Sequence, residues 1–225
     1  MAAEESLIAV VGGTGNLGAA LARRWVKAGL DLIIGSRDAL RAAETAAHLT
    51  RELGRRVDSA SNRDAAERAS LVVVTVPYAA QSATLTDIRP VVSGKVVLDT
   101  TVPLLPPKVM RVQLPEEGAA ALRAQRLLGP SAVVVSAFHN VAAHRLATGE
   151  SVDCDVLVFG DDRQARARVV RLAQAAGLRG LHGGPLANSA AAEALTSVLI
   201  FVNKTYAVDG AGVRLTGNFT PPADE

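Results

Sequence analysis

The hydrophobic positions in the first half of the chain form short unbroken runs, and longer Ala-rich stretches separate these runs. A run without polar alternation is typical of a strand buried on both faces, whereas apolar residues three and four apart indicate a helix. The predicted strands and helices follow one another as Leu7–Val11, Asn16–Ala28, Asp31–Ile34, Asp38–Leu53, Arg56–Ser59, a short helix from Asn62, Leu71–Val76 and Lys95–Leu98. This alternation predicts an α/β fold whose parallel sheet is covered on both faces.

The pattern changes in the second half of the chain. The segment Val102–Pro115 contains four prolines, which predicts an extended excursion. The elements predicted beyond it are a helix Glu116–Leu128, strands Ala132–Ser136 and Asp155–Phe159, a helix over 162–176, a strand Leu178–Leu181 and a long helix from about Ala187 to Val208. We therefore expect a larger domain over residues 1–136 and a smaller C-terminal part over residues 137–225, with a frayed end at Pro221-Pro222.

Composition narrows the classes of function. The formal net charge is +2, the basic residues are spread along helices, and aromatic residues make up 3%, so neither a basic patch nor a stacking surface for nucleic acid is predicted. Cys154 is the single cysteine, which excludes an internal disulfide. The four histidines show no metal-ligand spacing. We expect no nucleic-acid partner and no metal site.

The chain ends and the longest apolar stretches bear on where the protein acts. Residues 1–5 are acidic where a signal peptide would be basic. No apolar run approaches the about 20 residues that a membrane helix needs. With its single cysteine, the chain fits a reducing compartment. We expect a cytoplasmic protein with no membrane partner.

A glycine-rich segment directly follows the first predicted strand. Gly13-x-Gly15-x-x-Gly18 matches the dinucleotide-binding fingerprint, and it stands between a strand and a helix as that motif requires. Gly13 would make the tight turn, Gly15 would admit a pyrophosphate, and Gly18 would let the helix pack closely on the strand. The N–H groups at Asn16 and Leu17 would then face the phosphates. The alternative is a plain tight turn, and the context favours binding.

The end of the second strand indicates which dinucleotide binds. NAD sites usually carry Asp or Glu there, about 20 residues beyond the glycines, to contact the adenosine ribose. This chain has Gly35-Ser36-Arg37 instead. Asp38 comes one or two positions too late, and its place before a predicted helix indicates an N-cap.

Two arginines near that strand end favour NADP(H) over NAD(H). Arg37 and Arg41 are four residues apart, so they share a helix face and could both pair with a 2′-phosphate. The hydroxyl groups of Thr14 and Ser36 could add hydrogen bonds. The alternative is that both arginines are solvated surface charges, and their position at the ribose end favours the phosphate.

Six segments, in order along nearly the whole chain, carry a resemblance to a known family. They are Gly12–Gly18, Gly35–Arg37, Thr75–Pro77, Ser136–Val141, Val158–Asp162 and Gly184–Ser189. Together they resemble the NADPH-dependent deazaflavin-coenzyme reductases, the 8-hydroxy-5-deazaflavin:NADP oxidoreductases. The resemblance implies a Rossmann-type doubly wound parallel sheet with a small C-terminal α/β substrate part, and a homodimer. It also implies hydride transfer between NADP(H) and the deazaflavin coenzyme as co-substrate.

The resemblance further implies which residues bind each partner. The residues expected to bind NADP(H) are Gly13, Thr14, Gly15, Asn16, Leu17, Ser36, Arg37, Arg41, Val76, Pro77 and Ala137. The residues expected on the deazaflavin side are His139, Val141, Gly184, Pro185 and Leu186. The stretch from Pro103 to Gly129 departs from the family pattern because it is richer in proline and alanine.

Direct hydride transfer depends more on alignment than on acid–base chemistry. The donor and acceptor carbons must meet at about 3–3.5 Å, and the cofactors supply the organic chemistry. His139 follows a buried strand and is the candidate catalytic residue, because it could hydrogen-bond a substrate carbonyl. The alternative is a strand-end histidine with a structural partner. Backbone N–H groups near Gly183-Gly184 could stabilise charge on the ring.

Two other functions fit the same pattern. One is an NADPH-dependent reductase of a pterin, a flavin, an imine or a carbonyl compound. The other is a non-catalytic NADP-sensing protein. A short-chain dehydrogenase is disfavoured because it needs a lysine four residues after its tyrosine, and here Ser82 follows Tyr78 and Gly210 follows Tyr206.

Overall fold

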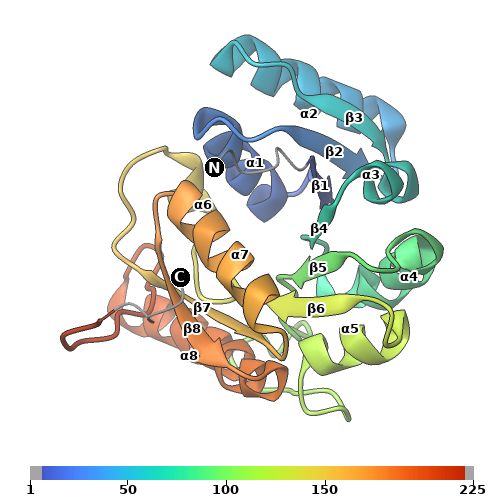
Figure 1. The fold of residues 1–225 in the computed structure, drawn as a ribbon. Helices are drawn as coiled ribbons and strands as arrows, with labels where there is room; N and C mark the ends of the chain where they lie inside the picture. Colours follow the sequence, from blue (N-terminus) through green and yellow to red (C-terminus); the bar gives the residue numbers. More distant parts are fainter. Residues whose placement is uncertain (1–6, 221–225) are drawn as a thin grey trace.

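Eight strands form one sheet through the middle of the molecule (Figure 1), and the computed structural model describes residues 7–220. The strands are β1 Ile8–Val11, β2 Leu32–Ser36, β3 Asp58–Ser61, β4 Leu71–Val74, β5 Val96–Asp99, β6 Val133–Ser136, β7 Asp155–Gly160 and β8 Arg179–Gly184. Their order across the sheet is β3-β2-β1-β4-β5-β6-β7-β8. The acidic first residues and Pro221-Pro222, which carried sequence expectations, lie outside the described residues.

Eight helices lie between or after the strands within residues 7–220. They are α1 Asn16–Lys27, α2 Ala39–Leu53, α3 Asn62–Arg68, α4 Tyr78–Ile88, α5 Ala120–Leu128, α6 Ala143–Ala147, α7 Arg163–Ala175 and α8 Ser189–Tyr206, with short 3-10 turns η1 Arg89–Val91 and η2 Leu186–Asn188. The sequence predicted six of the helices within a few residues and did not predict α4 and α6. Asp38 caps α2 by accepting the backbone N–H groups of Leu40 and Arg41, as predicted.

The sheet separates two apolar cores. Helices α1, α2, α6 and α7 cover one face, where Trp25 and Leu21 of α1 are completely buried. Helices α3, α4 and α5 cover the other face, where Leu85 of α4 belongs to the same apolar core as Val72 and Val134. Burial of strands such as β1 on both faces explains why their sequences show no polar alternation.

The predicted α/β fold class is confirmed, and one strand pair differs from the predicted parallel arrangement. β7 runs antiparallel to β6, whereas the other neighbouring pairs in the described sheet are parallel. The connection over residues 137–154 contains only the five-residue helix α6. A crossover between parallel strands usually contains a full helix, whereas this connection packs the short α6 against α1 and brings the chain back antiparallel to β6.

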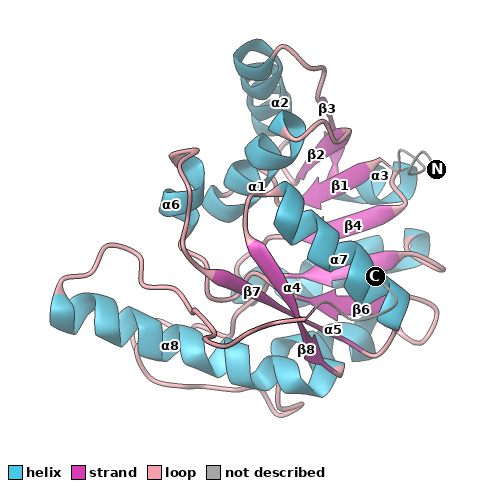
Figure 2. Cartoon of the chain, turned by 60° about the vertical axis from the view of Figure 1, so that its left-hand side comes forward, coloured by secondary structure: helices cyan, strands magenta, loops and turns pink. Residues whose placement is uncertain are grey.

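Helix α8 and the segment after it form the C-terminal end of the described chain. The far end of α8 reaches beyond the sheet (Figure 2), and Phe201 and Tyr206 on it are exposed. The following segment returns to the sheet, because Val213 accepts the Asp155 N–H at 2.7 Å and Asp155 Oδ2 accepts the Leu215 N–H at 2.7 Å. Arg179 also donates to Asp155 through two nitrogens. Residues 211–215 are therefore anchored to β7.

The last helical stretch corrects one sequence expectation. Among the described residues, Leu186–Tyr206 is long and apolar enough to cross a membrane by length and composition, with a mean hydropathy of 1.3. The expectation that no apolar run approaches this length is therefore wrong. One such helix is weak evidence for a membrane span, because core helices of other proteins pass the same criterion.

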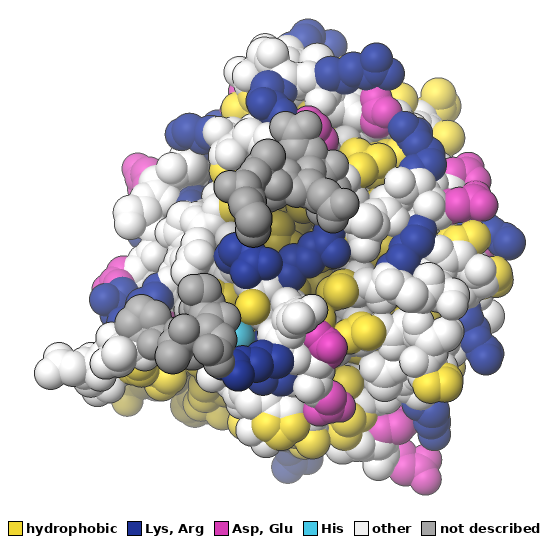
Figure 3. Space-filling view, viewed as in Figure 1, with side chains coloured by type: hydrophobic (Ala, Val, Ile, Leu, Met, Phe, Trp, Pro, Cys, Tyr) yellow, Lys and Arg dark blue, Asp and Glu magenta, His cyan; other side chains and the backbone are white. Residues whose placement is uncertain are grey.

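Charged side chains are distributed over the visible surface. In the space-filling view, Lys and Arg lie scattered among acidic, apolar and uncharged side chains (Figure 3). This distribution agrees with the near balance of 24 basic and 22 acidic residues in the sequence.

Candidate functional site

The carboxyl ends of β1, β2 and β4 meet at one edge of the sheet and form the floor of a cleft. Ligands of open parallel sheets bind at this edge, outside the strand ends. The cleft has a volume of about 530 Å³ and is lined by Gly12, Thr14, Gly15, Ser36, Arg37, Asp38, Arg41, Asn62, Thr75, Val76, Pro77 and Ala80. It thus brings together seven of the residues predicted to bind NADP(H), namely Thr14, Gly15, Ser36, Arg37, Arg41, Val76 and Pro77.

The glycine loop connects β1 to α1 by tight backbone hydrogen bonds. Gly13 N–H donates to Gly35 O at 3.0 Å, and Gly15 N–H donates to Gly12 O at 3.0 Å. Gly15 is the N-cap of α1 and supplies no side-chain acceptor, so the first N–H groups of the helix are open to an anion. Gly18 lies so close to β4 that a Cβ there would be 2.5 Å from Thr75 Oγ1.

The hydroxyl groups predicted at the ribose end lie side by side. Thr14 Oγ1 and Ser36 Oγ are 3.5 Å apart, and Ser36 Oγ accepts the N–H of Asp38 at 3.2 Å. These contacts join the glycine loop to the beginning of α2. The two hydroxyl groups can therefore act together on one ligand group.

Arg37 and Arg41 are suited to binding a phosphate. Both are exposed in the cleft, and neither guanidinium has an ion pair or hydrogen bond with any described residue. An arginine without a protein partner keeps its full donor capacity for a ligand anion. One cleft is therefore lined by the two arginines, by the hydroxyl groups of Thr14 and Ser36 and by the N-terminus of α1. This combination fits a dinucleotide carrying a 2′-phosphate.

Four other predicted cofactor residues lie outside the lining of this cleft. Gly13, Asn16 and Leu17 belong to the glycine loop and the first turn of α1. Ala137 follows β6, is completely buried, and donates its N–H to Asp99 O at 3.3 Å. Through this hydrogen bond Ala137 continues the carboxyl edge of the sheet beyond β5.

The segment after β6 is a sharp, buried turn. Phe138 has a φ of 65°, a left-handed conformation that is costly for a bulky residue and is found mainly at functional or tightly constrained positions. Its ring packs edge-on against Trp25 at 6.1 Å between centroids. Asn140 Nδ2 donates to Ala192 O at 2.8 Å and to Thr196 Oγ1 at 3.1 Å. Helix α8 therefore holds this turn in place.

His139 lies in this turn with 6% of its surface exposed. Its Nε2 is 2.6 Å from Ser136 Oγ, and its backbone carbonyl accepts the Thr196 hydroxyl at 3.0 Å. Burial lowers the pKa of His139 to about 3, so the ring is neutral at neutral pH. His139 can therefore hydrogen-bond a ligand but cannot act as a cationic acid at neutral pH.

The other residues predicted on the deazaflavin side differ in their accessibility. Pro185 is exposed, and Val141 and Gly184 are partly buried. Leu186 is 1% exposed in the core beneath β6, and its N–H donates to Asp161 Oδ1 at 3.0 Å. None of these residues lines the 530 Å³ cleft.

Two buried carboxyl groups, Glu193 on α8 and Asp99 at the end of β5, influence each other electrostatically. Glu193 of α8 accepts the N–H groups of Ala120 and Ala121 at 2.6 and 3.1 Å, and so caps the start of α5. Asp99 at the end of β5 accepts Gln81 Nε2 at 2.6 Å. Burial, together with the charge of Asp99, raises the pKa of Glu193 to about 7, and burial raises the pKa of Asp99 to about 6. The pair can hold a proton at neutral pH.

Glu193→Gln is expected to become more stable relative to the wild type as the pH rises from about 5 to 8. The folded protein keeps the Glu193 proton up to about pH 7, whereas an unfolded chain releases it near pH 4.3. The contribution of Glu193 to the free energy of unfolding therefore falls over this window, by about 3 kcal/mol. Glutamine does not titrate. The measurement is urea unfolding of both proteins at several pH values.

His139 makes an opposite contribution, because its lowered pKa makes the free energy of unfolding rise with pH up to about 6.5. Both proteins contain His139, so its contribution cancels when they are compared. Glu44→Gln, at an exposed position of α2, is the matched control and should show no such pH dependence. A stability difference between Glu193→Gln and wild type that stays constant from pH 5 to 8 would contradict the buried proton.

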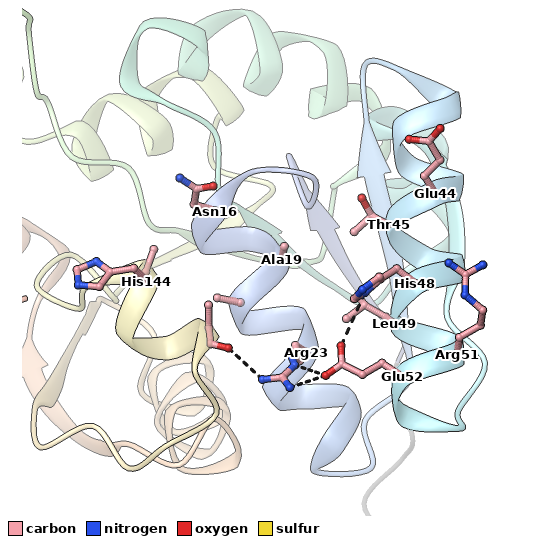
Figure 4. A pocket seen from close by; sticks show the side chains of 13 residues that line it. Asn16, Ala19, Arg23, Glu44, Thr45, His48, Leu49, Arg51, Glu52 and His144 are labelled. Carbon is pink, nitrogen blue, oxygen red and sulfur yellow. Dashed lines mark hydrogen bonds and ion pairs between the residues drawn. The ribbon is translucent and has the colours of Figure 1, made fainter.

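A larger cavity of about 1140 Å³ lies elsewhere, between α1, α2 and α6 (Figure 4). Several of its charged groups have protein partners, whereas Glu44 and Arg51 in its lining have none among the described residues. Arg23 pairs with Glu52, Glu52 also lies 3.7 Å from His48, and the bond from Arg23 lowers the pKa of Glu52. His144 pairs with Asp209. The smaller cleft instead joins the unpaired Arg37 and Arg41 to the glycine loop, which is why we place the nucleotide there.

Sequence reasoning did not name five of the residues that line the cleft as cofactor-binding residues, namely Gly12, Asp38, Asn62, Thr75 and Ala80. Asn62 and Thr75 each follow directly after a strand. Residues just beyond the carboxyl ends of parallel strands gather at the same edge, so this rule could have identified both. Gly12 has a φ of 78°, and a Cβ there would meet Val76 Cγ1 at 2.6 Å, so it is a glycine for steric reasons.

Comparisons with known proteins agree with this site. Residues 7–103 match the family model described as NADP oxidoreductase coenzyme F420-dependent. The chain is 42% identical over 218 residues to the F420-dependent NADP reductase of Methanothermobacter thermautotrophicus, covering 93% of this chain and 94% of that protein. The chain belongs to this family. The F420-dependent NADP reductase of Methanocaldococcus jannaschii is 37% identical over 219 residues, covering 93% of this chain and 97% of that protein.

A solved structure shows the same fold in a family member. The crystal structure of a candidate F420-dependent NADP-reductase from Arthrobacter sp. FB24 superimposes with a TM-score of 0.77 at 27% identity. It covers 93% of this chain and 99% of that protein. The Rossmann-type fold of the family thus extends over nearly the whole described chain.

Proposed function

We propose that this family member is an oxidoreductase that transfers a hydride between NADP(H) and coenzyme F420, an 8-hydroxy-5-deazaflavin. The observation that carries the proposal is the pair of unpaired arginines, Arg37 and Arg41, beside a glycine loop in one cleft. The relatives that are 37–42% identical over 93% of the chain bear the name of this reaction.

The NADP(H) half of the proposal rests on the strand-end geometry. The backbone of Gly13, Gly15, Asn16 and Leu17 would hold the pyrophosphate at the α1 N-terminus, since no side chain caps that helix. The hydroxyl and guanidinium groups that would bind the 2′-phosphate are those of Thr14, Ser36, Arg37 and Arg41. Val76, Pro77 and Ala137, which follow β4 and β6, would line the nicotinamide side.

We assign the deazaflavin to the C-terminal side of the same sheet edge. His139, Val141, Gly184, Pro185 and Leu186 are the residues proposed to bind it, and Leu186 lies buried behind the exposed Pro185. This division corresponds to a nucleotide-binding domain over residues 1–136 and a substrate part over residues 137–225. The capping of α5 by Glu193 would keep the two parts in a fixed relation.

The protein's part in the chemistry is alignment. NADPH supplies the hydride and the deazaflavin ring accepts it together with a proton from water, and the reverse direction releases both. The glycine loop and the arginines fix the position of the dinucleotide, and the turn at residues 137–141 borders the place of the second ring. His139, which is neutral at neutral pH, would donate or accept one hydrogen bond there without adding charge.

We further propose that the protein is a cytoplasmic homodimer. Val198, Phe201 and Tyr206 on α8 are 46%, 54% and 72% exposed, which leaves a large apolar surface on the projecting helix. Burying such a surface against a second copy would remove it from water. The buried thiol of Cys154 is compatible with a reducing compartment.

The proposed reaction is tested by mixing the purified protein with NADPH and oxidised coenzyme F420 and following the visible absorbance of the deazaflavin. We expect bleaching that requires enzyme and NADPH, and much slower bleaching with NADH. Tight NADPH binding without bleaching would contradict the proposed acceptor. In that case, assays with a pterin, a flavin, an imine and a carbonyl compound would separate another reductase from an NADP sensor.

A further inference from the structure

Asn62 occupies a central place in the nucleotide cleft that no predicted role explains. It is the first residue of α3, directly after β3, and only 4% of it is exposed. Its side chain reaches over β2 to the glycine loop, where Oδ1 accepts the N–H of Gly12 at 3.2 Å. Asn62 therefore touches the segment that would hold the phosphates, although the two residues are 50 positions apart.

A side chain at residue 35 of β2 would crowd Asn62, and the glycine there leaves it room. A Cβ at Gly35 would lie 3.1 Å from Asn62 Oδ1 and 3.3 Å from the methyl group of Ala65. Gly35 itself accepts the N–H groups of Gly12 and Gly13 at 3.1 and 3.0 Å. The asparagine amide is thus packed into the corner between β1, β2 and α3, and its position is well defined.

The hydrogen bond from Gly12 fixes which way the amide faces. An N–H group can donate only to the oxygen, so Oδ1 points to Gly12 and Nδ2 points the other way. Within residues 7–220, Nδ2 donates to no acceptor, and it is not among the polar atoms closed off from solvent. Asn62 therefore presents a free N–H donor in the cleft lined by Ser36, Arg37 and Arg41.

We propose that Asn62 is a dinucleotide-binding residue, which positions the glycine loop through Oδ1 and donates a hydrogen bond from Nδ2 to the adenosine ribose of NADP(H), and whose lack of charge permits a 2′-phosphate beside it. The proposal rests on the assignment of this cleft to NADP(H). The ribose must lie between the pyrophosphate at the glycine loop and the 2′-phosphate at Arg37 and Arg41. Asn62 lines this stretch of the cleft and adds a donor without adding charge.

The neutrality of Asn62 matters because the neighbouring ligand group is an anion. A carboxylate at this position would still accept the Gly12 N–H, but it would replace the free donor with a negative charge. Such a charge would repel a 2′-phosphate and would accept a hydrogen bond from a free 2′-hydroxyl group, as acidic residues do in NAD sites. The side chain at position 62 should therefore shift the preference between the two dinucleotides.

The test compares the Kd values of NADPH and NADH for the wild type, Asn62→Asp and Asn62→Ala, measured by calorimetric titration of the full chain. For Asn62→Asp we expect the Kd of NADPH to rise about tenfold more than that of NADH. For Asn62→Ala, which loses both contacts, we expect both Kd values to rise by similar factors of about five to ten. Asp64→Asn, an exposed substitution on the same helix, is the matched control.

Thermal unfolding of each variant separates folding from recognition, since Asn62→Asp keeps the acceptor for Gly12. A folded Asn62→Asp protein whose ratio of NADPH to NADH affinity equals that of the wild type would overturn the inference. If the wild type itself binds no NADPH, the proposed function fails instead, and the two failures are distinguishable.

Discussion

Arg37→Ala is expected to raise the Kd of NADPH about 30-fold while changing that of NADH by less than about twofold. Arg37 lies exposed in the nucleotide cleft and has no partner among the described residues, so its only strong contact would be the 2′-phosphate. NADH lacks this phosphate and gives the guanidinium nothing to bind. The two Kd values are measured by titration of wild type and variant at one fixed salt concentration, because ionic strength screens the pair.

Arg51→Ala is the matched control for this substitution. Arg51 lies in the last turn of α2, whereas Arg37 precedes the N-cap of that helix, and both are exposed. It should leave both affinities unchanged, because it does not line the cleft. Equal and small losses for NADPH and NADH in Arg37→Ala would show that Arg37 is an ordinary surface charge and would remove the argument for NADP(H).

Gly15→Ala and Gly18→Ala should both weaken NADPH binding, but only Gly18→Ala should also destabilise the protein. A Cβ at Gly15 would have no contact closer than 3.3 Å, and Gly15 has a φ of −81°, which alanine adopts easily. That Cβ would occupy the space for the pyrophosphate. A Cβ at Gly18 would lie 2.5 Å from Thr75 Oγ1 and 2.9 Å from Gly12 O. The backbone of the glycine loop would have to move to make room for this Cβ.

The two substitutions are expected to differ in their effects on the Kd of NADPH and on the free energy of unfolding. Overpacking costs about 1–3 kcal/mol, which corresponds to a Kd increase of about 10- to 100-fold for Gly15→Ala. Gly18→Ala should lose a similar amount of folding stability, offset by about 1 kcal/mol of helix propensity. Tm from thermal unfolding and Kd from titration distinguish the variants. A Gly15→Ala protein that binds NADPH like the wild type would show that no pyrophosphate lies against this loop.

Features governed by neighbouring residues could be predicted from the sequence. The glycine loop, the Asp38 cap and the strand-end arginines each depend on residues only a few positions apart. The buried strands were recognisable because burial on both faces removes polar alternation, as in β1 and β4. The part of the cleft formed by the glycine loop and the strand-end arginines could therefore be predicted from the sequence.

Features that depend on distant parts of the chain could not be predicted in this way. Helix α4 was missed because Tyr78–Ile88 shows no helical spacing of its apolar residues, and helices in proteins draw most of their stability from tertiary packing. The contact of Asn62 with Gly12 and the capping of α5 by Glu193 span 50 and 73 positions. Such long-range contacts leave no local pattern in the sequence, because they form only when the sheet assembles. The reversal of β7 likewise depends on how residues 137–154 fold back.

The most direct test of the hydride transfer is an isotope experiment with the complete protein. NADPH carrying deuterium at the transferring position of C4 is incubated with the enzyme and oxidised coenzyme F420, and the reduced deazaflavin is examined by mass spectrometry. The account predicts one deuterium in the reduced ring, because the hydride passes directly between two aligned carbons. Reduced coenzyme F420 without deuterium, or no reduction although NADPH is bound, would contradict direct hydride transfer at this site.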